Sequence, residues 1–543
     1  MNCQAKSCLQ LAVIWHISLL MLLPVLVSSV AVRDPRPNIV FVLADDYGYY
    51  DIGYHGKQIK TPHLDDLCSS GVRLENYYVQ PICVPTRSQL MSGMYQIHTG
   101  LQHSNTPLLP LNIPTVADKI KEAGYSTHMV GKWHLGFRRK ENMPSYRGFD
   151  TMFCFLDGHE SYYEHARSYR GKGPYLDLRT EKGPAFNYSG IYSANMYTER
   201  AINMLKNHAS SQPDTPLFLY LAYQSVHTPL QVPDHYMKNY KHIKDINRRK
   251  YAGMVAALDE GVGNLTEALK SLGMWDNTVF IFSSDNGGHN RNGGASNWPL
   301  RGKKGTLWEG GMRANGFVTG GRVERSGVIS NELIHVSDWF PTLVGLAKGN
   351  LNGTKLDGYD QWNTINKGTA SPREVILHNI DILRPRLGQP IFNSTFDSSI
   401  RAAIRVGDYK LITGDCGDDE WVPPPGVRER SLHSVNAAHL LETRNNRGIN
   451  MANGNSKSFA RAQKKIERGS QHIREGKKNV WLFNIREDPT EHHDLSDKEP
   501  ERVRQMLDHL LVFNKTAVPP IKLHRDPRSN PALHGNVWGP WLD

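Results

Sequence analysis

Two apolar runs that lie far apart in the chain both end in a pair of polar side chains. Ile39–Leu43 is followed, after one alanine, by Asp45 and Asp46, and Val279–Phe282 is followed by two serines and then by Asp285-Asn286. Short, continuous apolar runs are typical of strands that are buried on both faces of a sheet. In open α/β sheets, ligands gather at the carboxyl ends of such strands. We therefore predict an α/β fold built on a mostly parallel sheet.

The polar pairs at these two strand ends predict a metal site. Asp45, Asp46, Asp285 and Asn286 are oxygen donors, with no thiolate or imidazole among them. Such a set favours Ca²⁺ or Mg²⁺ over zinc. Adjacent carboxylates also repel each other unless a cation lies between them. For either strand end alone, a solvated turn is the alternative, because Asp and Gly also favour turns.

Candidate catalytic lysines and histidines follow two further predicted strands and lie in one basic turn. The predicted strand Tyr125–Val130 leads to Lys132 and His134, whose alternation places them on one side of an extended segment. A second predicted strand, 216–223, leads to His227. The basic turn around Lys304 offers a contact for an anion held at the metal. The alternatives are surface lysines and structural histidines.

One cysteine lies at a predicted helix start. Cys83 precedes Pro85-Thr86-Arg87, and proline is tolerated in a first helical turn. The free amides and dipole of a helix N-terminus favour negative charge there. Arg87, one turn along, then faces the same site. The alternative is a buried or disulfide-bonded structural cysteine.

The N-terminus predicts the compartment. An apolar stretch over Leu9–Val27 and the small residues within Ser28–Val32 indicate a signal peptide at 1–31, with an uncleaved membrane anchor as the alternative. No other stretch is long and apolar enough to span a membrane. The mature protein is therefore expected in the secretory pathway, without a stable membrane span. Five sequons for N-glycosylation fit this route: Asn187, Asn264, Asn352, Asn393 and Asn514.

The 543-residue chain is long enough for a large domain and a smaller one. We expect a catalytic α/β domain over 32–395 and a smaller α+β domain over 396–543. A hairpin pattern at 402–412 and an amphipathic helix at Glu501–Asn514 indicate the second domain. A basic insertion at 427–479, with twelve Lys or Arg against four Glu, carries most of the net charge of +11. It is expected to be a solvated linker with a short helix near Phe459–Arg468, or alternatively a polyanion-binding patch. Because the chain is expected to be secreted, nucleic acid is not an expected partner.

The cysteine segment, from Cys83 to Arg87 with Leu90 and Gly93, resembles the signature of the sulfatase family. The likeness is greatest to the branch that includes arylsulfatase B, the N-acetylgalactosamine-4-sulfatase, and its relatives arylsulfatases I and J. The resemblance implies an alkaline phosphatase-like fold, in which helices sandwich a large mixed, mostly parallel sheet beside a smaller C-terminal antiparallel sheet plus helix. The stretches that carry it are Leu43–Asp46, Tyr95–His103, Met129–Gly136, Asn297–Gly302 and Trp538–Trp541.

The resemblance also implies roles for individual residues. In the family, the cysteine matching Cys83 is oxidised to formylglycine by the formylglycine-generating enzyme in the endoplasmic reticulum. One Ca²⁺ ion would be held by Asp45, Asp46, Asp285, Asn286 and the modified Cys83. The formylglycine hydrate would be held and activated by Arg87, Lys132 and His134. Sulfate and the leaving group would be contacted by His227 and Lys304. Thr86 stands where most members have serine.

The implied activity is hydrolysis of sulfate esters, with 4-sulfated N-acetylgalactosamine of chondroitin or dermatan sulfate as the expected substrate. The lysosome or the extracellular space is the expected location. Two alternatives stay open. One is a phosphate ester hydrolase of the same superfamily, and the other is a secreted, non-catalytic protein that binds polyanions.

Overall fold

The computed structural model describes residues 36–103, 107–425, 478–523 and 526–542. The predicted signal peptide and the helix expected at Phe459–Arg468 lie outside these residues, as does nearly all of the basic insertion. Among the helices of the described residues, none is both long enough and apolar enough to cross a membrane.

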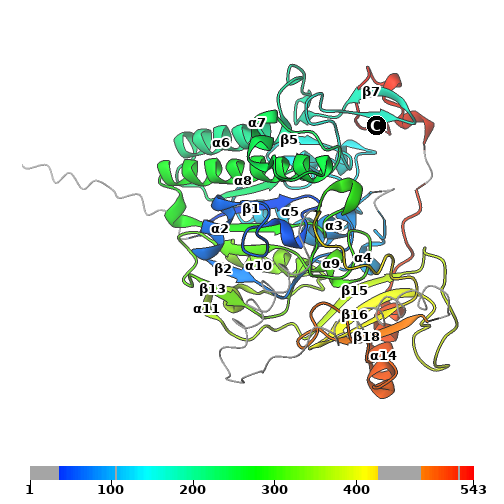
Figure 1. Ribbon diagram of the computed structural model, residues 1–543. Coiled ribbons are helices and arrows are strands. Elements are labelled where there is room, and N and C mark those ends of the chain that lie inside the picture. Colours follow the sequence, from blue (N-terminus) through cyan, green and yellow to red (C-terminus); the bar gives the residue numbers. More distant parts are fainter. Residues whose placement is uncertain (1–35, 104–106, 426–477, 524–525, 543) are drawn as a thin grey trace, which may run out of the picture. The chain divides into compact units, whose positions relative to one another are not determined.

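A ten-stranded mixed sheet forms the centre of the chain (Figure 1). Its strand order is β13-β2-β12-β11-β1-β10-β4-β5-β8-β9. The inner strands β11, β1, β10, β4 and β5 run parallel, whereas β12 is antiparallel to both of its neighbours. The predicted large, mostly parallel sheet is thus confirmed. The strands are β1 (Asn38–Ala44), β2 (Val72–Leu74), β4 (Ser126–Lys132), β5 (Thr151–Phe155), β8 (Arg179–Thr180), β9 (Gly183–Pro184), β10 (Leu217–Ala222), β11 (Thr278–Ser284), β12 (Gly316–Thr319) and β13 (Val328–Ser330).

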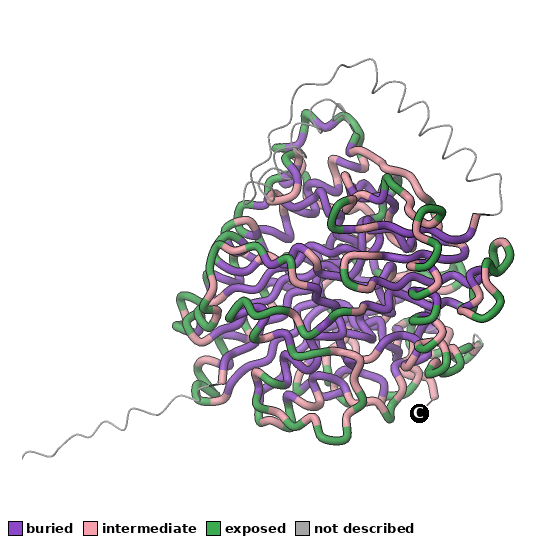
Figure 2. Tube along the Cα trace, turned by 90° about the horizontal axis from the view of Figure 1, so that it is seen from below, coloured by how far each residue is buried: buried purple, intermediate pink, exposed green. Residues whose placement is uncertain are grey.

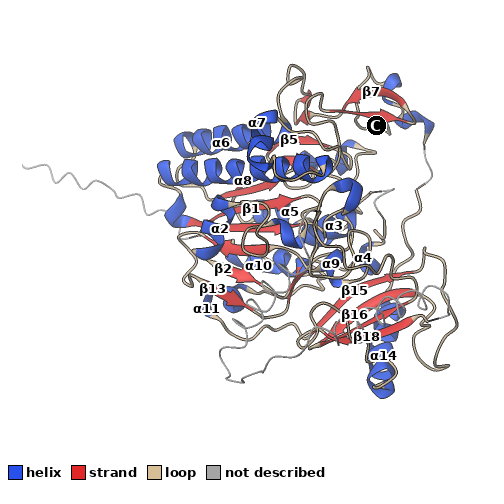
Figure 3. Cartoon of the chain, viewed as in Figure 1, coloured by secondary structure: helices blue, strands red, loops and turns tan. Residues whose placement is uncertain are grey.

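Helices cover both faces of this sheet (Figure 3). Alternate residues of β1 point to opposite faces. Val40 and Val42 belong to one hydrophobic core, which contains residues of α2, α6 and α8. Ile39 and Phe41 belong to a second core, which contains residues of α3, α5 and α10. The helices are α2 (Pro62–Ser69), α3 (Cys83–Ser92), α4 (Gln96–Thr99), α5 (Val116–Glu122), α6 (Ser193–Ser211), α7 (Asp234–Met237), α8 (Ile246–Ser271), α9 (Glu309–Met312), α10 (Trp339–Leu346), α11 (Trp362–Lys367) and α14 (Pro500–Thr516).

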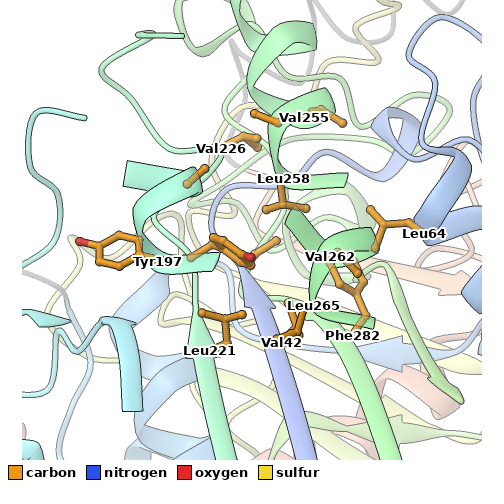
Figure 4. Close-up of a cluster of buried hydrophobic side chains, with 14 of the residues drawn as sticks. Val42, Leu64, Tyr197, Leu221, Val226, Val255, Leu258, Val262, Leu265 and Phe282 are labelled. Carbon is orange, nitrogen blue, oxygen red and sulfur yellow. The ribbon is translucent and has the colours of Figure 1, made fainter. Parts of the chain in front are cut away.

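Figure 4 shows the first of these cores, where Val42, Leu221 and Phe282 of the sheet face Leu258 and Val262 of α8. All five side chains are fully buried. Each contributes about 1.5–3 kcal/mol through removal of apolar surface from water. Figure 2 shows the buried residues, in purple, concentrated in the middle of the molecule. This burial on both faces explains why the strand sequences are continuously apolar.

The register of the parallel strands brings their carboxyl ends to one edge of the sheet. Ala44 is paired with Ser284, while Leu43 is paired with Ala222 and Ala222 with Gly131. The polar segments that follow β1, β10, β4 and β11 therefore start side by side. This edge holds the site described below.

A separate antiparallel sheet forms from β15 (Val375–Asp381), β16 (Arg401–Val406), β17 (Tyr409–Thr413) and β18 (Val480–Asn484). Helix α14 packs on it through the core that contains Val503 and Leu507. The predicted hairpin is β16–β17, and the predicted terminal helix is α14. The first strand, β15, precedes residue 396, so the small sheet begins earlier in the chain than the expected domain boundary. The boundary itself stays a prediction.

Buried charged side chains join the small sheet to helix α9. Lys410 of β17 lies with its Nζ 2.8 Å from Oε1 of Glu309 and 2.8 Å from Oε1 of Glu491. The other oxygen of Glu491 accepts the backbone N–H of Glu309 at 2.8 Å. All three side chains are fully buried, so the ion pairs are shielded from salt and water.

The segment between Gly148 and Tyr192 differs from expectation, because its tyrosine, glycine and charge content indicates a surface loop. The structure places β5 here as an inner strand, together with β8, β9 and the two-stranded sheet of β6 (Ala166–Tyr169) and β7 (Lys172–Leu176). The five residues of β5 pair with β4 over His128–Lys132. Its sequence, Thr-Met-Phe-Cys-Phe, is a short run of residues that favour strands, but it stands in a segment otherwise rich in tyrosine, glycine and charge. One further two-stranded sheet joins β3 (Tyr77–Tyr78) to β14 (Ile334–His335).

Candidate active site

All of the proposed metal and catalytic residues lie at the carboxyl edge of the large sheet. Asp45 and Asp46 follow β1, His227 follows β10, and Asp285-Asn286 follows β11. Lys132 ends β4 and His134 comes two residues later, while Cys83 is the first residue of α3 and Lys304 lies in the loop before α9. The backbone itself joins these segments, because Asp45 N–H donates to Ser225 O and Asp285 N–H to Ala44 O, both at 2.9 Å.

The acidic residues form one buried cluster. Asp46 N–H donates to Asp285 Oδ1 at 3.1 Å, and Asn286 Nδ2 donates to Asp46 Oδ1 at 2.7 Å. Asp46 has a left-handed backbone with φ of 56°. Such strain in a non-glycine residue costs of order 1–3 kcal/mol and concentrates at functional sites.

Two buried oxygens of this cluster fit a cation. Among the described residues, Asp45 Oδ1 and Asn286 Oδ1 have no hydrogen-bond partner, although both residues are fully buried. Ligand atoms of Asp45, Asp46 and His227 all lie within 4.8 Å of one another. Buried polar oxygens are expected to have partners, and oxygen donors of this kind are those that Ca²⁺ and Mg²⁺ prefer. These residues could therefore hold a metal ion, and we call them the acidic metal site below.

Three cations surround the carboxylates. Lys132 Nζ lies 2.5 Å from Asp45 Oδ2, and Lys304 Nζ lies 2.5 Å from Asp46 Oδ1. Arg87 donates to Asp285 Oδ2 through Nη2 at 2.9 Å and Nε at 3.2 Å.

These cations set the charge of the carboxylates. Burial alone would raise the pKa of Asp45, but Lys132 and the cations around it hold that pKa well below its usual range. Burial and the charge of Asp45 instead raise the pKa of Asp285 to about 7, against the opposing effect of Arg87. A bound cation would favour the ionised form of all three carboxylates.

Cys83 faces His134 inside this cluster. Its Sγ lies 3.4 Å from His134 Nδ1, and its side chain is 4% exposed. Burial raises the pKa of the Cys83 thiol above its ordinary value. A protonated thiol is a weak nucleophile, so the unmodified side chain is poorly suited to attack an ester. Nearby, Thr86 Oγ1 accepts the backbone N–H of Gln80 at 2.9 Å, which holds the start of α3.

The two histidines differ in their surroundings. Burial lowers the pKa of His134 well below its ordinary value, and burial also lowers the pKa of His227 to about 4. The Nδ1 of His227 lies 2.6 Å from Thr228 O, so its Nε2 is the atom that faces Asp46 Oδ2, at 3.6 Å. His227 is therefore oriented to act on an oxygen near the metal site.

The loop that carries Lys304 is held from two sides. Gly305 N–H donates to Pro81 O at 2.7 Å, next to the segment of Cys83. On the other side, Gly302 N–H donates to Glu420 O at 3.0 Å. The guanidinium of Arg301 lies between the rings of Trp308 and Trp421, 3.7 and 4.5 Å from their centroids. We call these contacts of Arg301 and Gly302 the Arg301 clamp.

One residue beside the site was not singled out from the sequence. Asp157 follows β5 and its Oδ1 lies 3.8 Å from His134 Nε2. The ring of His159 stacks on that of His227 at a centroid distance of 5.7 Å. A signal for Asp157 exists in its place after a strand end, but that strand was not predicted.

The five sequon asparagines lie on the surface. Asn187, Asn264, Asn352 and Asn393 are exposed, and Asn514 is partly exposed. Each is therefore accessible to a glycan, although their modification stays a prediction.

The sheet topology, together with the acidic cluster and the two lysines and one arginine around it, indicates the structural class of this protein. A large mixed, mostly parallel sheet with helices on both faces, beside a separate small antiparallel sheet, is the arrangement of the alkaline phosphatase-like α/β fold. Comparison with known proteins identifies the family within this class. The family model described as sulfatase matches residues 37–349, which is more than half of the chain. The chain belongs to the sulfatase family and hydrolyses sulfate esters.

Similar proteins support this assignment. Arylsulfatase J of Mus musculus is 48% identical over 519 residues, which cover 93% of this chain and 80% of that protein. N-acetylgalactosamine-6-sulfatase of Homo sapiens is 29% identical over 383 residues, covering 65% and 70%. The crystal structure of Ps i-CgsB in complex with k-i-k-neocarrahexaose has a TM-score of 0.69 at 27% identity and covers 92% of this chain and 98% of that one. The predicted likeness to the branch that includes arylsulfatase J is thus confirmed.

Proposed function

We propose that this protein is a formylglycine- and calcium-dependent sulfatase that removes 4-sulfate from N-acetylgalactosamine units of chondroitin or dermatan sulfate. The observation that carries the proposal is the contact between Cys83 Sγ and His134 Nδ1 at 3.4 Å, at the acidic metal site. An unmodified thiol held there has a raised pKa and little nucleophilic power. The position is better explained as the precursor of another nucleophile.

Conversion of Cys83 to formylglycine would supply that nucleophile. The hydrated aldehyde offers one hydroxyl to attack sulfur and a second whose deprotonation expels the sulfate. The formylglycine-generating enzyme of the endoplasmic reticulum is the proposed partner for this conversion. The signal peptide expected from the sequence would bring the chain to that compartment.

The residues that would hold Ca²⁺ are Asp45, Asp46, Asp285 and Asn286, together with residue 83. The unpartnered oxygens of Asp45 and Asn286 support this assignment. When bound there, Ca²⁺ would offset the negative charge of the sulfate group.

The remaining side chains have separate roles in this proposal. Lys132 and Lys304 offset charge on the sulfate oxygens, where charge develops during the reaction. His227, with Nε2 facing the site, would give a proton to the leaving sugar oxygen when its ring is protonated, a form that its lowered pKa of about 4 confines to acidic pH. His134 receives a proton from residue 83 through Nδ1. Arg87 holds Asp285 in place.

The proposed substrate rests on the relatives. Human N-acetylgalactosamine-6-sulfatase acts, by its name, on the same sugar, and the protein in the matched crystal structure is bound to a carbohydrate. The 4-sulfate position follows from the resemblance of the sequence to N-acetylgalactosamine-4-sulfatases. The lysosome or the extracellular space is the proposed location.

Mass spectrometry of secreted protein tests the modification. The tryptic peptide Leu74–Arg87 contains Cys83 and is expected to have lost sulfur and gained an aldehyde. Cys83→Ala is expected to abolish hydrolysis of arylsulfates, whereas Cys416→Ala, also at a buried free cysteine, retains it. An unmodified thiol in an active enzyme would overturn the formylglycine mechanism.

A substrate comparison tests the specificity. We expect sulfate release from 4-sulfated, but not from 6-sulfated, N-acetylgalactosamine disaccharides. We also expect hydrolysis of aryl phosphates to be slower than hydrolysis of arylsulfates. Preference for the phosphate ester would favour a phosphate ester hydrolase. Tight binding of chondroitin sulfate without turnover by converted protein would favour the non-catalytic alternative.

A further inference from the structure

We propose that Asp157 is a positioning residue for His134 and that it acts on the release of sulfate. The inference rests on the proposed function, because it assigns a task to a side chain beside the proposed nucleophile. It concerns a residue for which neither the sequence motif nor the family match provides a role.

The ring of His134 lies between Cys83 and Asp157. Its Nδ1 faces Cys83 Sγ at 3.4 Å, and its Nε2 faces Asp157 Oδ1 at 3.8 Å. The second distance is within ion-pair range and longer than a direct hydrogen bond. Contacts of this kind often tighten only when substrate is bound. One imidazole therefore connects residue 83 to a carboxylate on its far side.

Gly158 holds the ring from another direction. A β-carbon on Gly158 would lie 2.9 Å from Cε1 and 3.1 Å from Nε2 of His134, so only glycine permits this approach. Gly158 N–H also donates to Asp157 Oδ1 at 2.7 Å. The backbone of His134 is fixed to the same segment, because its N–H donates to Leu156 O at 3.2 Å. Asp157 and Gly158 together therefore restrict how the ring of His134 can turn.

Asp157 is itself held in place by contacts with Arg167 and Asp177. Its Oδ2 forms an ion pair with Arg167, whose guanidinium lies 4.5 Å from the ring centroid of Trp538. The backbone N–H of Asp157 donates to Asp177 Oδ2 at 3.2 Å. The side chain of Asp157 is 22% exposed, so its contacts are partly shielded from water. A carboxylate anchored in this way can orient a histidine, as outer carboxylates do for catalytic and metal-bound imidazoles.

The arrangement determines which nitrogen of His134 carries its hydrogen. A carboxylate beside Nε2 favours the hydrogen there, which leaves the lone pair of Nδ1 facing residue 83. During sulfate release, the free hydroxyl of residue 83 gives its proton to Nδ1 and its electron pair forms the C=O bond. The C–O bond to sulfate then breaks, and that electron pair leaves with the sulfate. Asp157 would therefore assist this step, whereas release of the alcohol depends on His227.

Rapid-mixing kinetics of an aryl sulfate on Ca²⁺-loaded, converted protein separates the two steps. In Asp157→Asn we expect a burst of about one equivalent of phenol per site, followed by turnover about 10–100-fold slower than wild type. KM is expected not to rise, because substrate contacts are retained. Asp157→Glu should recover part of kcat, and Arg167→Gln should show a smaller defect of the same kind. Asp276→Asn, at an exposed residue at the opposite end of β11, is the matched control and should behave as wild type.

Two results would overturn the inference while leaving the proposed function intact. One is an unchanged kcat in Asp157→Asn, and the other is an equal slowing of phenol and sulfate release without a burst. Mass spectrometry of residue 83 and a melting curve are measured for each variant. If Asp157→Asn does not fold, the same burst criterion is applied to Asp157→Glu, and a wild-type-like kcat with no burst there counts against the inference. A wild-type enzyme without aldehyde or without sulfate release would instead contradict the proposed function.

Discussion

Both Nε and Nη2 of Arg87 donate to the same oxygen of Asp285, at 3.2 and 2.9 Å. The other oxygen of Asp285 accepts the N–H of Asp46. Arg87 therefore helps to keep Asp285 ionised although burial and the charge of Asp45 raise its pKa to about 7. The arginine of the cysteine motif thus supports a carboxylate of the proposed metal site.

Replacing Arg87 by Met should weaken Ca²⁺ binding at pH 7. Without the guanidinium, the pKa of Asp285 rises further, so that Ca²⁺ must compete with a proton. We expect at least a tenfold loss of Ca²⁺ affinity by titration calorimetry, with part of it recovered at pH 8.5. Arg486→Met, at a side chain that is 68% exposed, is the control. Equal affinities of Arg87→Met and wild type at pH 7 would contradict this role.

Ca²⁺ should stabilise the folded protein through the acidic cluster. A ligand that binds only the folded state at 100 times its Kd stabilises it by about 2.7 kcal/mol. Thermal melts with Ca²⁺ and with a chelator should therefore differ for wild type. We expect no such difference for Asp46→Asn, whereas Asp508→Asn, at an exposed position on α14, should respond as wild type. A full Ca²⁺ response in Asp46→Asn would place the ion elsewhere.

Glu491 should make the protein less stable as the pH rises. Burial, reinforced by Glu309 and opposed by Lys410, raises the pKa of Glu491 from 4.5 to about 7. Between these values the folded state binds a proton that the unfolded chain has lost. The resulting stability is fully present below pH 4.5 and is lost as the pH rises through 7. The shift corresponds to at most about 3 kcal/mol.

Urea unfolding at several pH values checks this expectation. Wild type should lose stability between pH 5 and 8, and Glu491→Gln should lose less over the same interval because it cannot titrate. Glu501→Gln, at an exposed residue of α14, should follow wild type. If Glu491→Gln keeps the full pH dependence, another group is responsible.

The Arg301 clamp should affect substrate binding through the loop of Lys304. Arg301→Lys keeps the charge but loses the planar stacking on the two tryptophans. It also loses the paired hydrogen bonds of Nε and Nη2 to Asp419, at 2.9 and 3.2 Å, which lysine cannot form. We expect KM for an arylsulfate to rise by roughly tenfold, equivalent to about 1.4 kcal/mol, with a smaller change in kcat. Arg486→Lys is the control in steady-state assays. A fall in kcat with unchanged KM would show that the loop acts on the chemical step instead.

The sequence predicts the central strands because β1, β10 and β11 are buried on both faces, so their patterns are continuous. It also predicts the polar residues at their carboxyl ends, since parallel strands bring those ends together. Strand β5 also has a continuous apolar sequence, but the tyrosines, glycines and charges around it indicate a loop. Its five residues form an inner strand because they pair with β4. That pairing joins residues that are distant in the sequence, so no local pattern indicates it.

Asp157 was missed because the strand that precedes it was not predicted. Its proximity to His134 depends on the register of β5 against β4. The buried charges of Lys410, Glu309 and Glu491 come from three distant segments, and no local pattern marks them as partners. The sequence thus predicted the site residues that follow the recognised strands β1, β4, β10 and β11. It missed Asp157, which follows the unrecognised strand β5.

Strands β17 and β18 are paired along their whole length, from Tyr409 with Asn484 to Thr413 with Val480. The ion pair between Lys410 and Glu491 adds a second link across the same junction. These contacts do not depend on the peptide bonds that join the two strands through residues 426–477. A protease that cuts the chain there would therefore produce a heavy and a light polypeptide that stay associated. Such a sulfatase would run as two bands on a denaturing gel and as one active particle in native buffer.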